Sequence, residues 1–371
     1  MPVLKSRGDS IEPLLFQKYP ALKGHIAWQS LGNFPTPVRK LEKLGKEIGH
    51  QNIWIKQDDK SSDAYGGNKV RKLEFILPEA LRLKRKTIIT FGGIGTNHGL
   101  ATTIHGRRLG LDTLLVLVDQ PVTAHVQEDL LLFHHFGAEI CRAHNTFGAG
   151  LRTIGYFLTR PGLHFVPTGG SSPLGALGFV NAAFELKNQI ESGQLPEPKY
   201  IFLALGSKGT LAGLMVGCRL AGLKSTVIGV RVAYHWLANE KNTAKLANSV
   251  ISLMRRHDKA VPDISFSEKD IHVVHDFFGE GYGFATSQGK EALGLIARTE
   301  NVELDLTYTA KAFAALLDFV KKHRELGNTP ILFWHTYSSV DLTTIVKQDH
   351  DYTKLPGSFH DVFQTNMIPY I

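Results

Sequence analysis

Apolar runs, glycine-rich turns and amphipathic stretches alternate along much of the chain. One such unit spans residues 87–118 and has a glycine-rich turn at 92–99, and a second spans 200–230 and has its turn at 206–210. In both units a short apolar run precedes the turn and a stretch with helical spacing follows it. Continuous apolar strands joined by helices are typical of parallel sheets covered on both faces. The pattern therefore predicts an α/β protein with two domains, each a mostly parallel sheet covered by helices.

The order of these segments indicates how the two domains share the chain. We expect residues 1–74 and 171–371 to form the larger domain, and 75–170 to form a smaller α/β domain inserted into it. Ligands of such sheets bind beyond the carboxyl ends of the strands, which predicts a site in the cleft between the domains. Residues 234–270 are polar and weakly periodic, so we interpret them as an insertion or lid. The tail after about Lys347 is predicted to be a surface extension.

Composition narrows the classes of protein without changing this picture. The 371 residues are 43% hydrophobic and 20% charged, as in ordinary globular proteins. The net charge is +8, but the basic residues form no tract interleaved with aromatics, so nucleic-acid binding is a distant third hypothesis. Two well-separated cysteines, Cys141 and Cys218, form no disulfide framework. With no signal-peptide pattern in residues 1–16 and no apolar run of membrane-spanning length, we expect a cytoplasmic protein.

Three cations crowd the start of a predicted helix. Asn68 suits the N-cap position, which places Lys69, Arg71 and Lys72 in the first helical turn. Cations there oppose the helix dipole by about 0.3–1 kcal/mol each. The sequence either tolerates this cost on a basic surface or places an anion nearby. The same field lowers the pKa of Lys69 and favours the neutral amine that imine formation requires.

The two glycine-rich turns are candidate ligand sites. Backbone N–H groups of residues 206–210, with the hydroxyls of Ser207 and Thr210, can surround a phosphate, although a tight packing turn would look the same. At the start of the other helix, Thr96 and the residues after it could bind a carboxylate or only cap the helix. The sequence contains no HExxH or CxxC motif and no GxSxG motif, so it predicts neither a metal site nor a serine hydrolase.

Taken together, these motifs resemble the fold-type II pyridoxal-phosphate enzymes. The branch they are most similar to contains D-cysteine desulfhydrase and 1-aminocyclopropane-1-carboxylate deaminase. The most specific stretch is Gly-Gly-Asn-Lys-Val-Arg-Lys-Leu-Glu at residues 66–74. The other matching stretches follow in the family's order: residues 36–38, 55–59, 169–171, 174–178, 281–283, 308–312 and 335–336.

The resemblance implies a pyridoxal 5'-phosphate cofactor, held mainly by the larger domain. Lys69 would be the Schiff-base lysine, Asn97 would bond the ring oxygen, and Thr309 would face the pyridine nitrogen. The turn at 206–210 would hold the phosphate. The deaminase branch has a glutamate where this chain has Thr309, which favours the desulfhydrase branch. The implied cofactor-binding residues are Lys69, Asn97, Gly206, Ser207, Lys208, Gly209, Thr210 and Thr309.

The resemblance also implies an activity. The catalytic residues would be Lys69, Thr96, Tyr282 and Tyr308, with Thr96 contacting the substrate and the two tyrosines lying over the substrate side. Lys69, once freed from the cofactor, would take the α-proton of a small amino acid. β-Elimination or deamination would then give a 2-oxo acid and ammonia. The family further suggests a homodimer.

Some positions depart from the family's pattern. The usual Gln-Ser-Asn-His becomes Gly-Thr-Asn-His at residues 95–98, and the usual His-Thr-Gly-Gly becomes His-Thr-Tyr-Ser at 335–338. The extra methyl of Thr96 crowds the substrate side, and Tyr337 either occupies space near the cofactor ring or points away from it. These changes keep open an alternative function: a regulatory protein that binds the cofactor and amino acids without performing the reaction.

Overall fold

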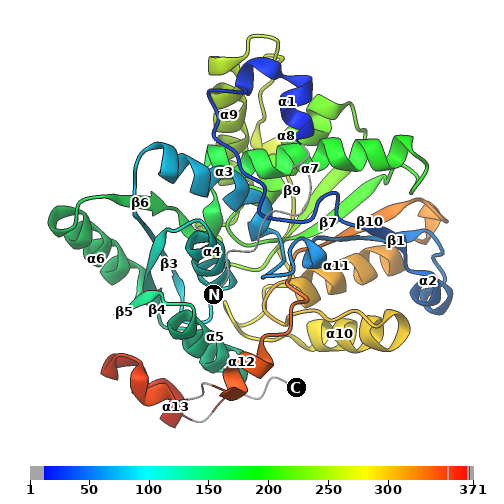
Figure 1. Cartoon of the computed structure of the whole chain (residues 1–371). Helices are drawn as coiled ribbons and strands as arrows, with labels where there is room; N and C mark the ends of the chain where they lie inside the picture. Colours follow the sequence, from blue (N-terminus) through cyan, green and yellow to red (C-terminus); the bar gives the residue numbers. More distant parts are fainter. Residues whose placement is uncertain (1–11, 349–350, 366, 368–371) are drawn as a thin grey trace.

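The computed structural model describes residues 12–348, 351–365 and 367, and contains two sheets (Figure 1). Residues 1–11, part of the segment that lacks a signal-peptide pattern, lie outside the described residues. The α/β class with mostly parallel sheets, predicted from the apolar runs, is confirmed. No helix in the described part of the chain is long and apolar enough to cross a membrane.

The larger sheet is parallel except at one edge. Its first strand pairs antiparallel with the second, and the remaining neighbours all run parallel. The chain enters the sheet at one edge, leaves it after its second strand, and returns for the others after completing the smaller sheet. In spatial order the strands are β1 (Val38–Lys40), β2 (Ile53–Gln57), β10 (Ile331–His335), β7 (Tyr200–Leu205), β8 (Thr226–Arg231) and β9 (His272–Val274).

The smaller sheet is parallel throughout. All its strands come from residues 87–166, within the predicted inserted domain of 75–170. The exact domain boundaries stay a prediction. In spatial order the strands are β5 (Glu139–His144), β4 (Asp112–Val118), β3 (Thr87–Gly93) and β6 (Leu163–Val166).

Alternate side chains of the larger sheet enter two separate cores, as the two-residue period of a strand requires. Leu203 and Trp334 pack into the core under α7, α8 and α9, whereas Phe202 and Phe333 pack into the core under α10 and α11. The sheet is therefore buried on both faces. These helices are α7 (Pro173–Glu191), α8 (Gly209–Ala221), α9 (Glu240–His257), α10 (Ser287–Glu300) and α11 (Thr309–Lys322).

The smaller sheet is covered less evenly. Its inner face packs on α3 (Lys69–Arg82), α4 (Asn97–Arg108) and α5 (Ala124–His135), which share one core with Leu115 and Val166. Its outer face packs on α6 (Thr146–Thr159), with Ala149 buried against Leu114 and Val116. Pro78 lies inside α3, which nevertheless continues as one helix.

Two segments differ from their predictions. Residues 240–257 are not a lid: they form α9, whose buried face includes Ala247, Val250 and Met254 in the larger core. The weak periodicity had concealed this face because polar residues fill the rest of the helix. The tail is also more than a surface extension, since Leu355 and Phe359 are buried in the core that contains α5.

Candidate active site

A cavity opens where the carboxyl ends of β3, β7 and β10 meet the starts of α3, α4 and α8. This is the edge at which parallel α/β sheets bind ligands. Gly209 and Thr309 are not among the residues that form its wall, although both adjoin residues that are. The sequence-predicted site residues that line the cavity are Lys69, Thr96, Asn97, Gly206, Ser207, Lys208, Thr210, Tyr282 and Tyr308.

Lys69 is the first residue of α3, and its side chain reaches the cavity. Its Nζ donates to Oδ1 of Asn68 at 2.8 Å. Asn68 in turn donates to Oγ1 of Thr210 at 3.1 Å, so its side chain does not cap the helix. Burial lowers the pKa of Lys69 to about 8, although the negative charge of Asp305 opposes the shift. A neutral, nucleophilic amine is therefore accessible near neutral pH.

The second cation of the first turn is neutralised by buried carboxylates. Arg71 donates two hydrogen bonds to Asp58, at 2.7 and 2.9 Å, and pairs with Glu185 at 2.8 Å. Lys56 also pairs with Glu185. These contacts join α3 to β2 and α7. They fix the start of the helix, and with it the position of Lys69.

The third cation, Lys72, has no such partner. Its Nζ donates to the carbonyl oxygen of Gly169 at 3.0 Å, and among the described residues no carboxylate lies within ion-pair distance. Burial lowers its pKa well below the usual value, and the charges of Lys69 and Lys208 lower it further. A buried amine facing other cations indicates that an anion belongs between them.

The turn before α8 has the geometry of an anion site. Lys208 occupies the N-cap position with φ +65°, and its own side chain does not cap the helix. The Gly209 N–H donates to Oγ of Ser171 at 3.0 Å, so it is the N–H groups of Thr210 and Leu211 that remain available to a ligand. A β-carbon on Gly209 would lie 2.6 Å from Oγ of Ser171 and 3.0 Å from Nζ of Lys72, so only glycine lets these groups converge. Ser171 also bonds Oγ of Ser207 at 2.8 Å.

The opposite side of the cavity is formed by the start of α4. Oγ1 of Thr96 accepts a hydrogen bond from the Gly99 N–H at 3.4 Å and caps the helix. The Tyr65 hydroxyl donates to Oδ1 of Asn97 at 2.9 Å. This bond occupies the amide oxygen of Asn97 and leaves its N–H groups as donors. Burial lowers the pKa of His98 well below its ordinary value, so the ring is neutral.

Two tyrosines and an aspartate complete the wall. The hydroxyls of Tyr282 and Tyr308 are hydrogen-bonded to each other, and burial raises the pKa of both. Asp305 accepts from the Tyr308 N–H at 2.7 Å and from the Thr309 hydroxyl at 2.6 Å. The prediction that Thr309 faces the pyridine nitrogen stays a prediction.

Sequence reasoning missed several residues in or directly behind this wall. Tyr65 and Asp305 line the cavity and had no signal of their own. Lys72 and Ser171 lie behind the wall, hydrogen-bonded to its residues Gly169 and Ser207, and stood within matching stretches without a role of their own. Tyr337, whose position relative to the cavity was left open, also lines it, and its ring lies edge-on to that of His125, with centroids 6.4 Å apart.

The residues present fit pyridoxal phosphate at separate points. The amine of Lys72, which has no ion-pair partner among the described residues, and the open N–H groups at the start of α8 suit a phosphate. The amine of Lys69 suits an aldehyde, and the free amide N–H groups of Asn97 suit a ring oxygen. The observed donor set therefore supports the cofactor that the motifs implied.

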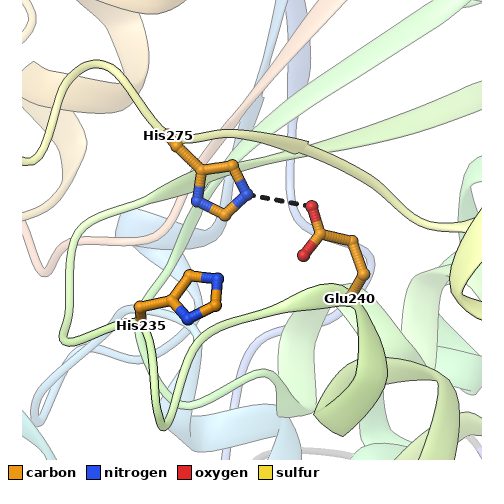
Figure 2. Close-up of side chains that lie close together, drawn as sticks. All are labelled: His235, Glu240 and His275. Carbon is orange, nitrogen blue, oxygen red and sulfur yellow. Dashed lines mark hydrogen bonds and ion pairs between the residues drawn. The ribbon is translucent and has the colours of Figure 1, made fainter.

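One cluster of metal-ligand type lies outside the cavity (Figure 2). Ligand atoms of His235, Glu240 and His275 lie within 4.8 Å of one another. Nδ1 of His275 accepts from Nε of Arg231 at 3.0 Å, so Nε2 carries the proton and donates to Glu240 at 2.9 Å. Both nitrogens of this ring are thus engaged. These three residues, called the clamp, are held together by the hydrogen bond between His275 and Glu240, with His235 beside it.

Comparison with known proteins agrees with this geometry. The chain is 36% identical over 311 residues to D-cysteine desulfhydrases of Salmonella newport and Salmonella typhimurium, covering 81% of this chain and 91% of theirs. The crystal structure of an ACC deaminase homologue matches with a TM-score of 0.73 and 28% identity, over 88% of this chain and 95% of that one. A threonine deaminase isoform from Solanum lycopersicum, at 18% identity and a TM-score of 0.57 over 94% of this chain and 95% of its own, shares the fold.

A family model described as pyridoxal-phosphate dependent enzyme matches residues 29–336. This range contains Lys69, both glycine-rich turns and the tyrosine pair. The chain therefore belongs to the family of pyridoxal-phosphate-dependent enzymes.

Proposed function

We propose that the protein catalyses the pyridoxal-phosphate-dependent elimination or deamination of a small amino acid, releasing a 2-oxo acid and ammonia. The observation that carries this proposal is the Lys69 amine, which has a lowered pKa and lies between an anion site and a set of hydrogen-bond donors. The similarity to D-cysteine desulfhydrases over most of the chain supports the same reaction class.

Each side of the cavity has a separate task in this proposal. Residues 206–210 and Lys72 hold the cofactor phosphate, Asn97 donates to the ring oxygen, and Thr309 faces the pyridine nitrogen. Pyridoxal phosphate supplies an aldehyde that condenses with amines and a ring that withdraws electrons from the α-carbon. Lys69 accepts the α-proton at Nζ. A carboxylate at the pyridine nitrogen would keep it protonated, whereas the hydroxyl of Thr309 does not.

The substrate side is formed by Thr96 and the tyrosine pair. The first N–H groups of α4 face an incoming substrate carboxylate. The hydroxyls of Tyr282 and Tyr308 are hydrogen-bonded to each other, and the one that is not donating in this bond can give its proton to the departing β-substituent. The raised pKa of each phenol keeps it protonated, and therefore a donor, at neutral pH.

Assays for ammonia and 2-oxo acid test the proposal. The panel includes D- and L-cysteine, D- and L-serine and 1-aminocyclopropane-1-carboxylate. We expect turnover of a cysteine and weaker or no turnover of the cyclopropane. A protein that binds the cofactor yet turns over none of these compounds would contradict the proposal and favour the regulatory alternative. The position of Tyr337 in the cavity wall is the observation that keeps this alternative in view.

We also propose that the protein is a homodimer that uses the outer face of α6. Phe147, Leu151, Ile154 and Leu158 are 77%, 55%, 60% and 82% exposed and follow one another at spacings of four and three residues. This spacing is that of a helix–helix seam, and an apolar stripe can pair with its own copy about a two-fold axis. The β-carbons of added side chains at Gly150 and Gly155 would meet nothing within 4 Å, so a second helix can approach closely.

Light scattering of Leu151→Lys/Leu158→Lys tests the dimer. We expect a monomer from this variant and a dimer from the control Leu83→Lys, which places one lysine on an exposed apolar position just after α3. A dimer from both variants would place the interface elsewhere. The reducing cytoplasm is the compartment we propose, because Cys141 and Cys218 are both free thiols.

A further inference from the structure

Two exposed aromatic side chains stand at the mouth of the cavity. Tyr234 and Trp236 line it while remaining 52% and 61% exposed, and Leu237 lines it beside them. Large aromatic side chains contribute most to binding when a partner covers them. Exposed aromatic side chains gathered at a cavity therefore indicate a binding surface. None of these residues is needed to hold the cofactor or to move a proton in the proposed reaction.

The turn that carries them is held by its own hydrogen bonds. The Leu237 N–H donates to the Tyr234 carbonyl at 3.0 Å, and the Asn242 side chain donates to the Trp236 carbonyl at 2.8 Å. Asn242 lies in the first turn of α9, which is packed into the larger core. The aromatic residues are therefore anchored to a buried helix.

The clamp shown in Figure 2 lies next to the same turn, which contains His235. Arg231 donates to the Ala233 carbonyl at 3.2 Å and to the ring of His275 at 3.0 Å. His275 continues the chain of hydrogen bonds to Glu240 at the start of α9. The ring of His235, between the two aromatic residues in sequence, lies 5.4 Å from that of His275.

The apolar surface continues from the turn into the cavity. Phe91 and Val118, at the ends of β3 and β4, line the cavity together with Leu237. The ring of Tyr234 packs edge-on against Phe278, with centroids 5.8 Å apart, which fixes its orientation. A substrate as small as free cysteine offers no apolar group to cover this surface. An amino acid with a larger apolar β-substituent does.

We infer that Trp236 and Tyr234 bind the leaving group of the substrate, and that the substrate class is amino acids with an apolar or aromatic substituent on the β-heteroatom. The inference rests on the proposed function. S-benzylcysteine represents the class. Its α-proton goes to Lys69, and the Cβ–S bond breaks with its electron pair leaving on sulfur, which is protonated. Addition of one water then gives pyruvate, ammonia and phenylmethanethiol. A preformed aromatic surface binds such a group with little ordering cost.

Comparison of two substrates in three variants tests the inference. In Trp236→Ala we expect kcat/KM for S-benzylcysteine to fall about tenfold or more, mainly through KM, while kcat/KM for cysteine changes less than twofold. Trp236→Phe should recover most of the loss. Leu83→Ala, which removes an exposed apolar side chain of another element, should change neither value.

A binding measurement separates this inference from the proposed reaction. The probe is 3-(benzylthio)propanoic acid, which lacks the amine and cannot react. We expect calorimetry to give a dissociation constant about tenfold higher for Trp236→Ala than for the unaltered protein. Equal affinities, or equal losses of turnover on both substrates, would overturn the inference. Failure of the unaltered protein to convert either substrate would instead count against the proposed function.

Discussion

The two glycine-rich turns share one local plan but present different chemistry to the cavity. The turn between β3 and α4 ends in Thr96, whose side chain caps the helix. The turn between β7 and α8 ends in Lys208, which has φ +65° and whose own side chain does not cap the helix. At α8 the Gly209 N–H donates to Oγ of Ser171, which lies outside the helix, and the next N–H groups remain open to a ligand.

The surrounding charges follow the same division. Near α8, Lys72 is a buried amine and Lys208 a partly buried one, the described residues offer neither an ion-pair partner, and Ser171 adds a hydroxyl. Near α4, the amide of Asn97 and the ring of His98 are uncharged, and the charges of Lys69 and Lys72 help to lower the pKa of His98. Both turns are rich in glycine, so glycine content does not distinguish them. The turn suited to a phosphate differs in its helix N-terminus, which has open N–H groups, and in the nearby amines that lack an ion-pair partner.

The largest expected effect comes from Lys69, which stands between the two turns. Lys69→Ala should abolish the imine absorption band of the purified protein and reduce turnover by at least about a thousandfold, because the amine that forms the imine and accepts the α-proton is lost. Absorption spectra before and after borohydride measure this. A Lys69→Ala protein that keeps a band reducible by borohydride would show that another residue forms the imine.

Lys72 tests the charge difference between the turns. Lys72→Met should raise the dissociation constant for pyridoxal phosphate by about 10–100-fold, because a charge-assisted contact to the phosphate is lost. The melting temperature of the cofactor-free protein should not fall, since a buried amine without an ion-pair partner is replaced by an apolar side chain of similar length. The control is Lys311→Met, another buried lysine with a lowered pKa, whose Nζ instead donates to the Phe278 carbonyl at 2.7 Å. An equal loss of cofactor affinity in both variants would contradict the proposed role of Lys72.

The rate at which the cofactor-free protein forms an imine with the cofactor should depend on pH. The pKa of Lys69 in the folded protein is lowered to about 8 from 10.5, so the reactive neutral amine gains population as the pH rises towards 8. The rate of imine formation in the cofactor-free protein should rise about tenfold from pH 6 to pH 7 and level off above about 8. Stopped-flow absorbance measures this rate. A rate that still rose tenfold between pH 9 and pH 10 would mean an unshifted amine.

The smallest expected effect tests the cap of α4. Thr96→Ala should lower the free energy of unfolding by about 1 kcal/mol and leave cofactor affinity within about twofold, because the cap stabilises the helix and donates nothing to the phosphate. Thr96→Ser retains the cap and should restore the stability. Urea unfolding and cofactor titration measure the two quantities. A large loss of cofactor affinity in Thr96→Ala would contradict the assignment of the phosphate to the α8 turn alone.

Much of the fold was predictable because its signals are local. The continuous apolar runs of β3 and β7 each lie on a few consecutive residues, and both gave the correct class. The buried face of α9 was not predictable, because long polar side chains fill most of its positions and its apolar residues become a face only when packed on α7 and α8. The packing of the tail was not predictable for a similar reason, since Leu355 and Phe359 form part of a core only together with α5.

The sequence by itself identified the lysine and the two glycine-rich turns as candidates, because each lies in one short segment, and it identified the family from an ordered set of such segments. Only the tertiary structure decided that Arg71 is neutralised while Lys72 is not, since their partners come from the turn after β2, from α7 and from the residues before α7. The tertiary structure also placed Trp236 at the cavity mouth. Its role depends on α9 and on a loop some forty residues further along the chain, which no local pattern could bring together.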